Sequence, residues 1–266
     1  MLDPAARSRL AAVSRFVDIR FFDSIDSTND YVAREARAGA AEGLVAVADH
    51  QATGRGRRGR RWDAPRGSSL LVSVLLRPRL PASRLHLIGV VAALSTADAC
   101  RAVAGVEARL KWPNDLLADG RKLGGVLVET ELSNRRAKMA VAGIGLNVWW
   151  PEGLPPGLAE GAITLGQLTG NEVPRPALLV ALLERLETRY AKLERPCGAE
   201  AQLEDYRSRC DTLGRLVRVE QSSERGPRSF TGTAVDVNAE GNLVVDDGDR
   251  PLVVSAAEVV HLRLPS

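Results

Sequence analysis

The chain has 266 residues, of which 45% are hydrophobic and 26% are charged, a composition typical of an ordinary soluble globular protein. Its net charge of +3 is too small to indicate a nucleic-acid-binding surface by itself, although the pI near 8.9 leaves one open. Three cysteines without metal-ligand spacing argue against a disulfide framework and indicate a reducing compartment. Neither a signal peptide nor an apolar run long enough to cross a bilayer is visible, so we expect a cytoplasmic protein.

Residues 1–15 show no clear periodicity and are interpreted as an N-terminal arm. A predicted strand over residues 16–22 follows and leads to a polar cluster, Ser27, Thr28 and Asn29, just before a predicted helix. These residue types favour the N-cap of a helix, although three in succession supply more donors and acceptors than a cap needs. A cap is the expected role, and a contact with a ligand stays open.

Two apolar runs, residues 44–48 and 69–76, are typical of buried strands. They frame the segment Gly54–Trp62, in which three glycines alternate with five arginines before a tryptophan. Glycine frees the backbone, and arginine offers a planar fork of donors to carboxylate or phosphate oxygens. We therefore predict a mobile loop that closes over a phosphate-bearing ligand. A disordered nucleic-acid-binding segment and a merely solvated loop are the alternatives.

Residues 84–104 predict a long, largely buried helix, and a second unusual stretch follows it. There Lys111 ends a strand-like run, and Pro113 interrupts regular structure before Asp115. This pattern favours a cation fixed at a strand end beside a carboxylate. An ordinary surface lysine with an apolar stem along the protein is the alternative.

The next predicted strand, residues 122–129, contains the pair Gly124–Gly125. Paired glycines in a strand either leave room for a ligand or another backbone, or mark a β-bulge, and both interpretations remain open. A second glycine-punctuated strand over residues 139–148 follows. Leucine spacing then predicts an amphipathic helix over residues 175–194, and a shorter helix is expected over residues 199–210.

From residue 213 the sequence pattern changes and predicts short strands separated by turns. Four such strands are predicted, and the turns at Gly241 and Gly248 are predicted hairpin tips. About fifty residues with this pattern predict a small SH3-like barrel.

Five stretches taken together resemble the biotin protein ligases. They are Ser27–Asn29, Gly54–Trp62, Lys111–Asp115, Lys122–Leu127 and Gly143–Asn147. Each motif is weak alone, but their order and spacing make the combination specific.

The resemblance covers about residues 16–266 and implies an α+β fold. The expected architecture is a catalytic biotin/ATP-binding domain over residues 16–212, with a mixed β-sheet and helices related to class II aminoacyl-tRNA synthetases. A C-terminal SH3-like domain over residues 213–266 follows.

The resemblance implies an ATP-dependent ligase. Biotin and Mg²⁺-bound ATP would give biotinyl-5′-AMP, and a lysine of a biotin carboxyl carrier domain, as in acetyl-CoA carboxylase, would then attack this anhydride. Some family members repress transcription through an N-terminal DNA-binding domain, but about fifteen residues precede the first predicted strand. We therefore expect an enzyme without repressor function, with neither DNA nor membrane as a partner. Whether it is a monomer or a homodimer is left open.

The resemblance also implies roles for individual residues. The catalytic cations would be Arg55, Arg57 and Lys111. Biotin would be bound by Ser27, Thr28, Asn29, Gln51, Gly54, Arg55, Gly56, Arg57, Lys111 and Gly125. ATP would be bound by Arg57, Arg60, Trp62, Lys111, Asn114 and Asn147, with the Trp62 ring stacked on adenine. Asp115 is the candidate ligand for Mg²⁺.

Three alternatives to this assignment remain. A lipoate or octanoate ligase or transferase shares the expected catalytic architecture, but its pocket needs no polar set to bind a ureido group. A nucleic-acid-binding protein would use the arginine-rich loop, and a steep salt dependence of binding would indicate it. An inactive family member is the third alternative, against which the presence of Arg55, Arg57 and Lys111 argues.

Overall fold

A computed structural model describes residues 15–133, 136–223, 226–255 and 258–262 of the chain. The N-terminal arm predicted over residues 1–15 lies outside this part except for Arg15.

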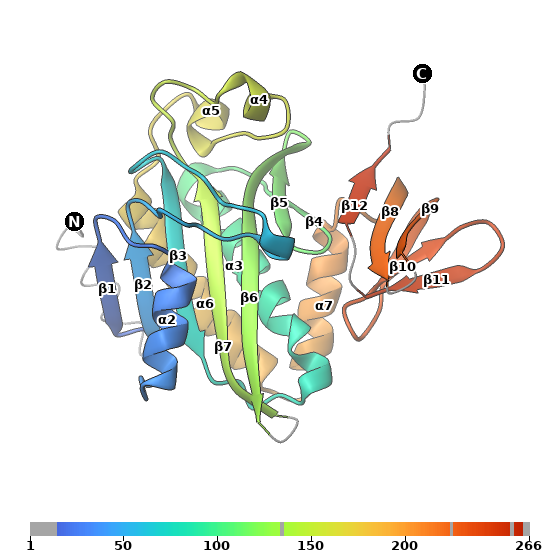
Figure 1. Ribbon diagram of the computed structural model, residues 1–266, viewed down its shortest axis with the longest axis horizontal. Coiled ribbons are helices and arrows are strands. Elements are labelled where there is room, and N and C mark those ends of the chain that lie inside the picture. Colours follow the sequence, from blue (N-terminus) through green and yellow to red (C-terminus); the bar gives the residue numbers. More distant parts are fainter. Residues whose placement is uncertain (1–14, 134–135, 224–225, 256–257, 263–266) are drawn as a thin grey trace.

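A seven-stranded sheet forms the centre of the larger part of the molecule (Figure 1). Its strands are β1 (Asp18–Phe22), β2 (Leu44–Ala48), β3 (Ser69–Leu76), β4 (Arg109–Lys111), β5 (Asp115–Ala118), β6 (Arg121–Ser133) and β7 (Arg136–Asn147). Their order across the sheet is β1-β2-β3-β7-β6-β5-β4. Strands β1 and β2 pair in parallel and the other neighbours pair antiparallel, which confirms the predicted mixed sheet.

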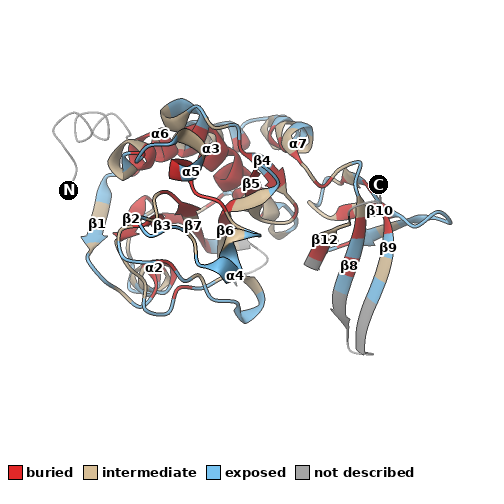
Figure 2. Ribbon diagram, turned by 90° about the horizontal axis from the view of Figure 1, so that it is seen from above, coloured by how far each residue is buried: buried red, intermediate tan, exposed pale blue. Residues whose placement is uncertain are grey.

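Helices cover both faces of this sheet (Figure 2). Helix α3 (His86–Ala104) and helix α6 (Arg175–Leu193) pack on one face, with α7 (Gly198–Arg209) beside them. Helix α2 (Thr28–Arg37) packs on the opposite face against β2, β3 and β7. The predicted helices are therefore present. Helix α2 begins earlier than expected because the polar cluster itself forms its first turn.

The segment Ala82–Ala104 is the one stretch, within the described ranges, that is long and apolar enough to cross a membrane. In this fold 72% of its apolar window is buried inside the protein, where α3 covers β6 and β7. Its hydrophobicity is thus explained by its place in the core, as predicted for a largely buried helix.

The C-terminal residues form a second sheet of five antiparallel strands. These are β8 (Leu216–Ser223), β9 (Gly226–Val237), β10 (Leu243–Asp246), β11 (Pro251–Val254) and β12 (Glu258–His261). Four were predicted, together with both hairpin tips; β12 was not. Trp112 joins the two sheets, because its Nε1 donates to the Gly241 carbonyl at 3.0 Å and its backbone N donates to Thr212 Oγ1 at 3.0 Å.

Two short helices, α4 (Pro156–Ala159) and α5 (Leu165–Thr169), lie in the connection between β7 and α6. Helix α5 begins with a capping box, in which Thr164 and Gln167 satisfy each other's backbone N–H groups. This connection closes one end of the seven-stranded sheet (Figure 1).

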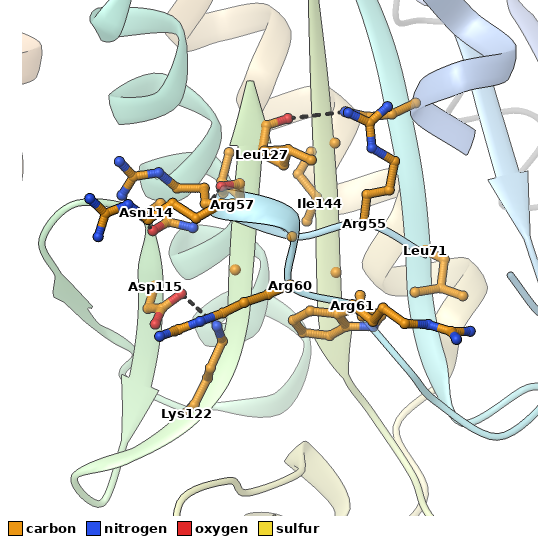
Figure 3. A pocket seen from close by; sticks show the side chains of 18 of the residues that line it. Arg55, Arg57, Arg60, Arg61, Leu71, Asn114, Asp115, Lys122, Leu127 and Ile144 are labelled. Atoms are coloured by element: carbon orange, nitrogen blue, oxygen red, sulfur yellow. Dashed lines mark hydrogen bonds and ion pairs between the residues drawn. The ribbon is translucent and has the colours of Figure 1, made fainter. Parts of the chain in front are cut away.

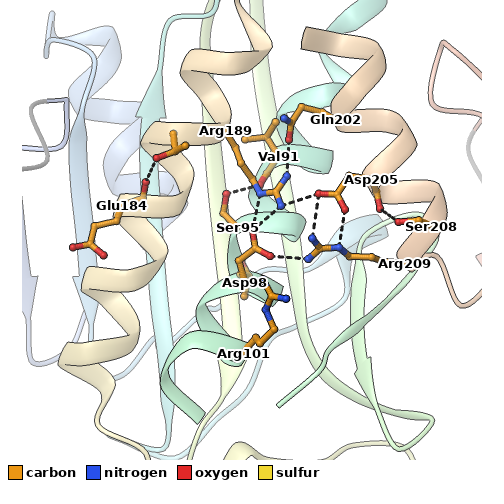
Figure 4. A network of polar contacts seen from close by, with 12 residues as sticks. Val91, Ser95, Asp98, Arg101, Glu184, Arg189, Gln202, Asp205, Ser208 and Arg209 are labelled. Atoms are coloured by element: carbon orange, nitrogen blue, oxygen red, sulfur yellow. Dashed lines mark hydrogen bonds and ion pairs between the residues drawn. The ribbon is translucent and has the colours of Figure 1, made fainter. Parts of the chain in front are cut away.

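A buried polar network ties α3, α6 and α7 together (Figure 4). Asp98, only 8% exposed, accepts from Arg189 Nε at 2.8 Å and from Arg209 Nη1 at 2.6 Å. Asp205 lies 2.8 Å from each of the same two guanidinium groups. Two carboxylates therefore neutralise two arginines, and these contacts connect α3, α6 and α7 to one another on this face of the sheet.

Candidate functional site

A cavity of about 180 Å³ lies on the face of the sheet that carries α2, underneath the arginine-rich segment Gly54–Trp62, hereafter the arginine loop (Figure 3). Strands β3, β6 and β7 form its floor, the first residues of α2 form one end, and the β4–β5 hairpin forms another side. Every site residue predicted from the sequence lines this cavity except Gly54 and Asn147.

The arginine loop is closed on itself by backbone hydrogen bonds. Trp62 N donates to the Gly54 carbonyl at 2.9 Å and Gly56 N donates to the Arg60 carbonyl at 2.7 Å. Gly54 is required at this position, because a Cβ atom there would lie 2.3 Å from the Trp62 carbonyl oxygen. The prediction of a loop between two buried strands is confirmed, and its form is a small hairpin laid across the sheet.

A polar group stands at the α2 end of the cavity. Gln51 Oε1 accepts from Thr28 N at 2.8 Å and lies 3.0 Å from Thr28 Oγ1. Ser73 Oγ lies 2.7 Å from Thr28 Oγ1 and 2.6 Å from Asn29 Oδ1. Ser27 is the N-cap of α2, and its Oγ accepts from Asp30 N at 3.3 Å. The cluster therefore caps the helix, as expected, and also lines the cavity.

The arginines of the loop have different surroundings. The guanidinium of Arg55 lies between two carboxylates: Nη1 donates to Asp30 and Nη2 donates to Glu129 Oε1 at 2.7 Å. Glu129 and Asp30 hold the pKa of Arg55 above its ordinary value. Arg57 reaches deeper, where its Nη1 donates to Asn114 Oδ1 at 3.3 Å, and burial lowers its pKa. Arg57 is therefore the loop arginine whose charge an anion in the cavity would stabilise most.

The opposite end of the cavity carries Trp62, Lys122 and Asp115. Lys122 Nζ lies 2.7 Å from Asp115 Oδ1 and 5.7 Å from the centre of the Trp62 ring. The Trp62 ring lies against β7 at Gly145, where a Cβ atom would come within 2.7 Å of it. Gly125 lies beneath the Asp115–Lys122 pair, with Asp115 Oδ1 3.3 Å from where its Cβ would be. The glycines of β6 and β7 thus leave room for side chains from other segments above the sheet.

Lys111 ends β4, pairs in register with Asp115 of β5, and lines the cavity. The predicted arrangement of a cation at a strand end beside a carboxylate is confirmed. The carboxylate of Asp115, however, forms its ion pair with Lys122, which the sequence reasoning had not singled out.

Two predicted residues lie elsewhere. Asn147 is buried at the end of β7, where its Nδ2 donates to the Ile163 carbonyl at 3.3 Å. Gly54 lines a second cavity of about 790 Å³ on the other side of the arginine loop. That cavity extends between α3 and the C-terminal sheet, with His86, Tyr206 and Glu240 among its lining residues.

Sequence reasoning missed four side chains of this site: Asp30, Ser73, Lys122 and Glu129. Lys122 was inside a motif that had been singled out, and a charged residue opening a glycine-paired strand was the signal available. Glu129 ends the same predicted strand. Its contact with Asn29 and Arg55 depends on pairing between distant segments, which the sequence pattern does not reveal.

In the part of the chain that the structure describes, no group of three or more histidines, cysteines or carboxylates is arranged to hold a metal ion. Asp115, the predicted ligand for Mg²⁺, lines the cavity beside Asn114, and its Oδ1 lies 2.7 Å from Lys122 Nζ. Mg²⁺ is commonly held by one or two carboxylates together with the phosphates of a nucleotide.

Comparisons with known proteins agree with this geometry. Residues 21–147 match the Biotin/lipoate A/B protein ligase family, and residues 212–262 match the Biotin protein ligase C terminal domain. The chain is 38% identical over 244 residues to the biotin–[acetyl-CoA-carboxylase] ligase of Mycobacterium tuberculosis, covering 89% of this chain and 86% of that protein. It is 33% identical to the bifunctional ligase/repressor BirA of Bacillus subtilis, covering 90% of this chain and 72% of that protein.

The structure also resembles a solved biotin protein ligase. The Aquifex aeolicus enzyme in complex with biotin and ATP superposes with a TM-score of 0.77 at 26% identity, covering 94% of this chain and 100% of that chain.

Proposed function

The chain belongs to the biotin protein ligase family, and we propose that it catalyses ATP-dependent biotinylation of a lysine on biotin carboxyl carrier domains. The observation that carries this proposal is the cavity under the arginine loop. It brings hydrogen-bonding side chains (Thr28 and Gln51) together with cations (Arg57 and Lys111).

In the first step the biotin carboxylate attacks the α-phosphate of ATP, biotinyl-5′-AMP forms, and pyrophosphate leaves. Anionic groups must approach one another, so positive charge at the reacting centre lowers the barrier. Arg57 of the arginine loop and Lys111 of β4, which both line the cavity, would supply it. Arg55 and Arg60 are proposed to assist from the same loop, Arg55 by exchanging one of its carboxylate partners for the ligand.

The ligand is positioned by the two ends of the cavity. Ser27, Thr28 and Gln51 would hydrogen-bond the ureido group, since hydroxyl and amide side chains offer both donors and acceptors. Asn29 would hold their turn. Gly125 would leave space for the bicyclic ring and its valeryl chain.

The Trp62 ring would stack on adenine, and Asn147 would hydrogen-bond the adenine edge after leaving the Ile163 carbonyl. Asn114 and Asp115 would hold Mg²⁺, which would supply further neutralisation of phosphate charge.

In the second step the amine of the carrier lysine attacks the carbonyl of the mixed anhydride, an amide bond forms, and AMP leaves. Lys111 would stabilise negative charge on the carbonyl or phosphate oxygens during this step. The activated intermediate is the adenylate, so no covalent acyl-enzyme is involved.

We also propose a division into a catalytic domain over residues 16–212, related to class II aminoacyl-tRNA synthetases, and an SH3-like domain over residues 213–266. The presence of two separate sheets supports this division. The second cavity supports a role for the C-terminal domain in docking the carrier protein or ATP, because that domain forms part of the cavity wall. A cytoplasmic location fits the expected carboxylase substrate.

Transfer of biotin to a purified biotin carboxyl carrier domain tests this function directly. With ATP, Mg²⁺ and biotin, we expect the mass of the carrier to increase by one biotinyl group, and a carrier whose acceptor lysine is replaced by arginine to remain unmodified. Transfer of lipoate in preference to biotin would move the protein to the lipoate-ligase branch of the family.

A further inference from the structure

We propose that Glu129 is a positioning residue that fixes the arginine loop relative to the polar end of the cavity. Its two carboxylate oxygens have different partners. Oε1 accepts from Arg55 Nη2 at 2.7 Å, and Oε2 accepts from Asn29 Nδ2 at 2.8 Å. One side chain of β6 therefore joins the first arginine of the loop to the first turn of α2. The expected effect of Glu129 on catalysis rests on the proposed function, whereas its role in fixing the loop does not.

On the α2 side, Glu129 belongs to a continuous polar chain. Asn29 Oδ1 lies 2.6 Å from Ser73 Oγ, which lies 2.7 Å from Thr28 Oγ1, which in turn lies 3.0 Å from Gln51 Oε1. Asn29 and Ser73 are buried, so these contacts are protected from water. The chain therefore links the proposed ureido-binding residues to the carboxylate of Glu129 without a break.

The position of Asn29 is also restricted by packing. A Cβ atom on Gly143 of β7 would lie 2.1 Å from Asn29 Oδ1, so this amide occupies the space above a glycine. Because Asn29 Oδ1 is engaged by Ser73, its Nδ2 is directed toward β6, where it meets Glu129. Glu129 thus receives a hydrogen bond from a side chain that has little freedom to move.

On the loop side, Arg55 lies where the loop closes. The backbones of Arg55 and Arg61 pair in an isolated antiparallel β-bridge, and the neighbouring Gly54 carbonyl accepts a hydrogen bond from Trp62 N. The Arg55 side chain is 46% exposed and that of Glu129 is 34% exposed. A single pair of this kind contributes little to stability. The arrangement is therefore suited to fix the position of the loop and contributes little to holding the fold together.

The consequence for catalysis follows from geometry. Without Glu129, Arg55 would be held by Asp30 through Nη1 alone. Arg57 is two residues from Arg55 in the same short hairpin, so this looser attachment would let Arg57 shift relative to the reacting phosphate. A displacement of about 1 Å at a reacting centre costs roughly 10²-fold in rate. Loss of Glu129 is therefore expected to lower the rate of adenylation although Glu129 does not line the cavity under the arginine loop.

Glu131 provides a matched control on the same strand. It is two residues further along β6 and also pairs with two cations, Arg37 Nε at 3.1 Å and Lys138 Nζ at 3.3 Å. It lies outside both cavities. The variants Glu129→Gln, Glu129→Ala and Glu131→Gln therefore separate the effect of this one carboxylate from that of removing charge from β6.

The first readout needs no substrate. Arg58, Arg60 and Arg61 are exposed trypsin sites in the loop. We expect tryptic cleavage within the loop to be several-fold faster in Glu129→Ala than in the wild type, with Glu129→Gln intermediate and Glu131→Gln unchanged. Melting temperatures within a few degrees of the wild type would show that the fold is intact. Equal loop cleavage in the Glu129 and Glu131 variants would overturn the proposal.

The second readout is biotin-dependent ATP–pyrophosphate exchange. We expect kcat/KM to fall roughly 10- to 100-fold in Glu129→Ala, less in the isosteric Glu129→Gln, and not in Glu131→Gln. Unchanged exchange in Glu129→Ala would contradict the positioning role. Absence of exchange in the wild type would instead contradict the proposed function, while the proteolysis result would still decide whether Glu129 fixes the loop.

Discussion

At the scale of single residues, the site depends on the space above the glycines of β7, where a side chain would otherwise be. Gly145 has the Trp62 ring against it, within 2.7 Å of where a Cβ atom would be. The ring can lie flat across the sheet only because that atom is missing. The absence of a side chain at Gly145 therefore allows Trp62 to form a wall of the cavity.

We predict that Gly145→Ala displaces Trp62 and raises KM for ATP about 10-fold, roughly the loss of one stacking contact. KM for biotin should change much less, because the polar group at Thr28 and Gln51 is at the other end of the cavity. Gly157→Ala is the matched control, since a Cβ at Gly157 would meet nothing within 4 Å. Equal increases in both KM values would show that the substitution acts through the fold and not through Trp62.

The sequence predicted free space beside the paired glycines, but it did not predict which side chains fill that space. Gly124–Gly125 was interpreted either as space for a ligand or as a bulge. The structure shows a register shift in the pairing of β5 with β6, with Lys122 and Asp115 near Gly125. Asn29 and Trp62 reach Gly143 and Gly145 from segments far apart in the chain, whereas Asp115 reaches Gly125 from the neighbouring strand. Such contacts depend on strand order, which local composition does not specify.

At the scale of elements, the network around Asp98 is the main polar contact between the helices behind the sheet. Burial acts to raise the pKa of Asp98, but hydrogen bonds from Arg209 and Arg189 outweigh burial and hold its pKa below the ordinary value of 3.8. The carboxylate is therefore charged in the native protein at neutral pH.

We predict that Asp98→Asn lowers the free energy of unfolding by about 3 kcal/mol, because two arginines lose a shared buried partner. Urea unfolding at pH 7 measures this. Glu220→Gln, which breaks the exposed pair with Arg218, should cost about 0–1 kcal/mol in the same experiment. A cost for Asp98→Asn no larger than that of the surface variant would contradict the assigned role of the network.

The same network predicts a pH dependence. A carboxyl whose pKa is lower when folded contributes stability that is fully present above its unfolded pKa and is lost as pH falls through the folded pKa. The difference in unfolding free energy between wild type and Asp98→Asn should therefore be constant above about pH 5 and shrink below the ordinary value of 3.8. A difference that persists unchanged at the lowest pH would show that Asp98 does not titrate in this way.

Strands were predicted best where burial is complete. The predicted runs 44–48 and 69–76 coincide with β2 and β3, because every residue of both strands is buried and their apolar composition is continuous. Strand β12 is short and carries charged residues, so its sequence lacks this signal and it was not predicted, whereas the short β4 was interpreted as a strand-like run ending at Lys111. Both exist because longer neighbours, β5 and β8, provide hydrogen-bonding edges for them.

At the scale of the whole molecule, the two sheets meet near the site. His261 of β12 lies at this junction, with its Nε2 3.1 Å from Thr212 Oγ1 and its Nδ1 3.7 Å from Asp211 Oδ2. Burial, with a smaller contribution from Lys111, lowers the pKa of His261 from 6.5 to about 4. The neutral imidazole is thus the form that the folded junction accommodates.

This shift predicts weaker folding in mild acid. Between about pH 6.5 and pH 4 the unfolded chain binds a proton at His261 that the folded chain does not, so stability falls as pH decreases through this range. The wild type should lose on the order of 1 kcal/mol more than His261→Gln between pH 7.5 and pH 5. Urea titrations at the two pH values measure this, and identical losses would contradict the assigned pKa.

The order of the elements along the chain was predictable, but their arrangement in space was not. Strand β3 is followed by α3, which carries the chain behind the sheet to its far edge, and β7 returns to pair with β3. This return brings Gly143–Gly145 beneath the arginine loop. Motif spacing and the family resemblance indicated that these segments meet, whereas hydrophobic periodicity alone gave no reason for it.

The most direct test of the central claim is biotin-dependent ATP–pyrophosphate exchange by the wild type, Lys111→Ala and Lys138→Ala. Lys138 is an exposed lysine of β7 paired with Glu131, outside both cavities. We predict exchange with biotin and not with lipoate, lost roughly 10²- to 10³-fold in Lys111→Ala and retained in Lys138→Ala. Absence of exchange in the wild type, or exchange that Lys111→Ala leaves intact, would contradict the conclusion that biotin is adenylated in the cavity under the arginine loop.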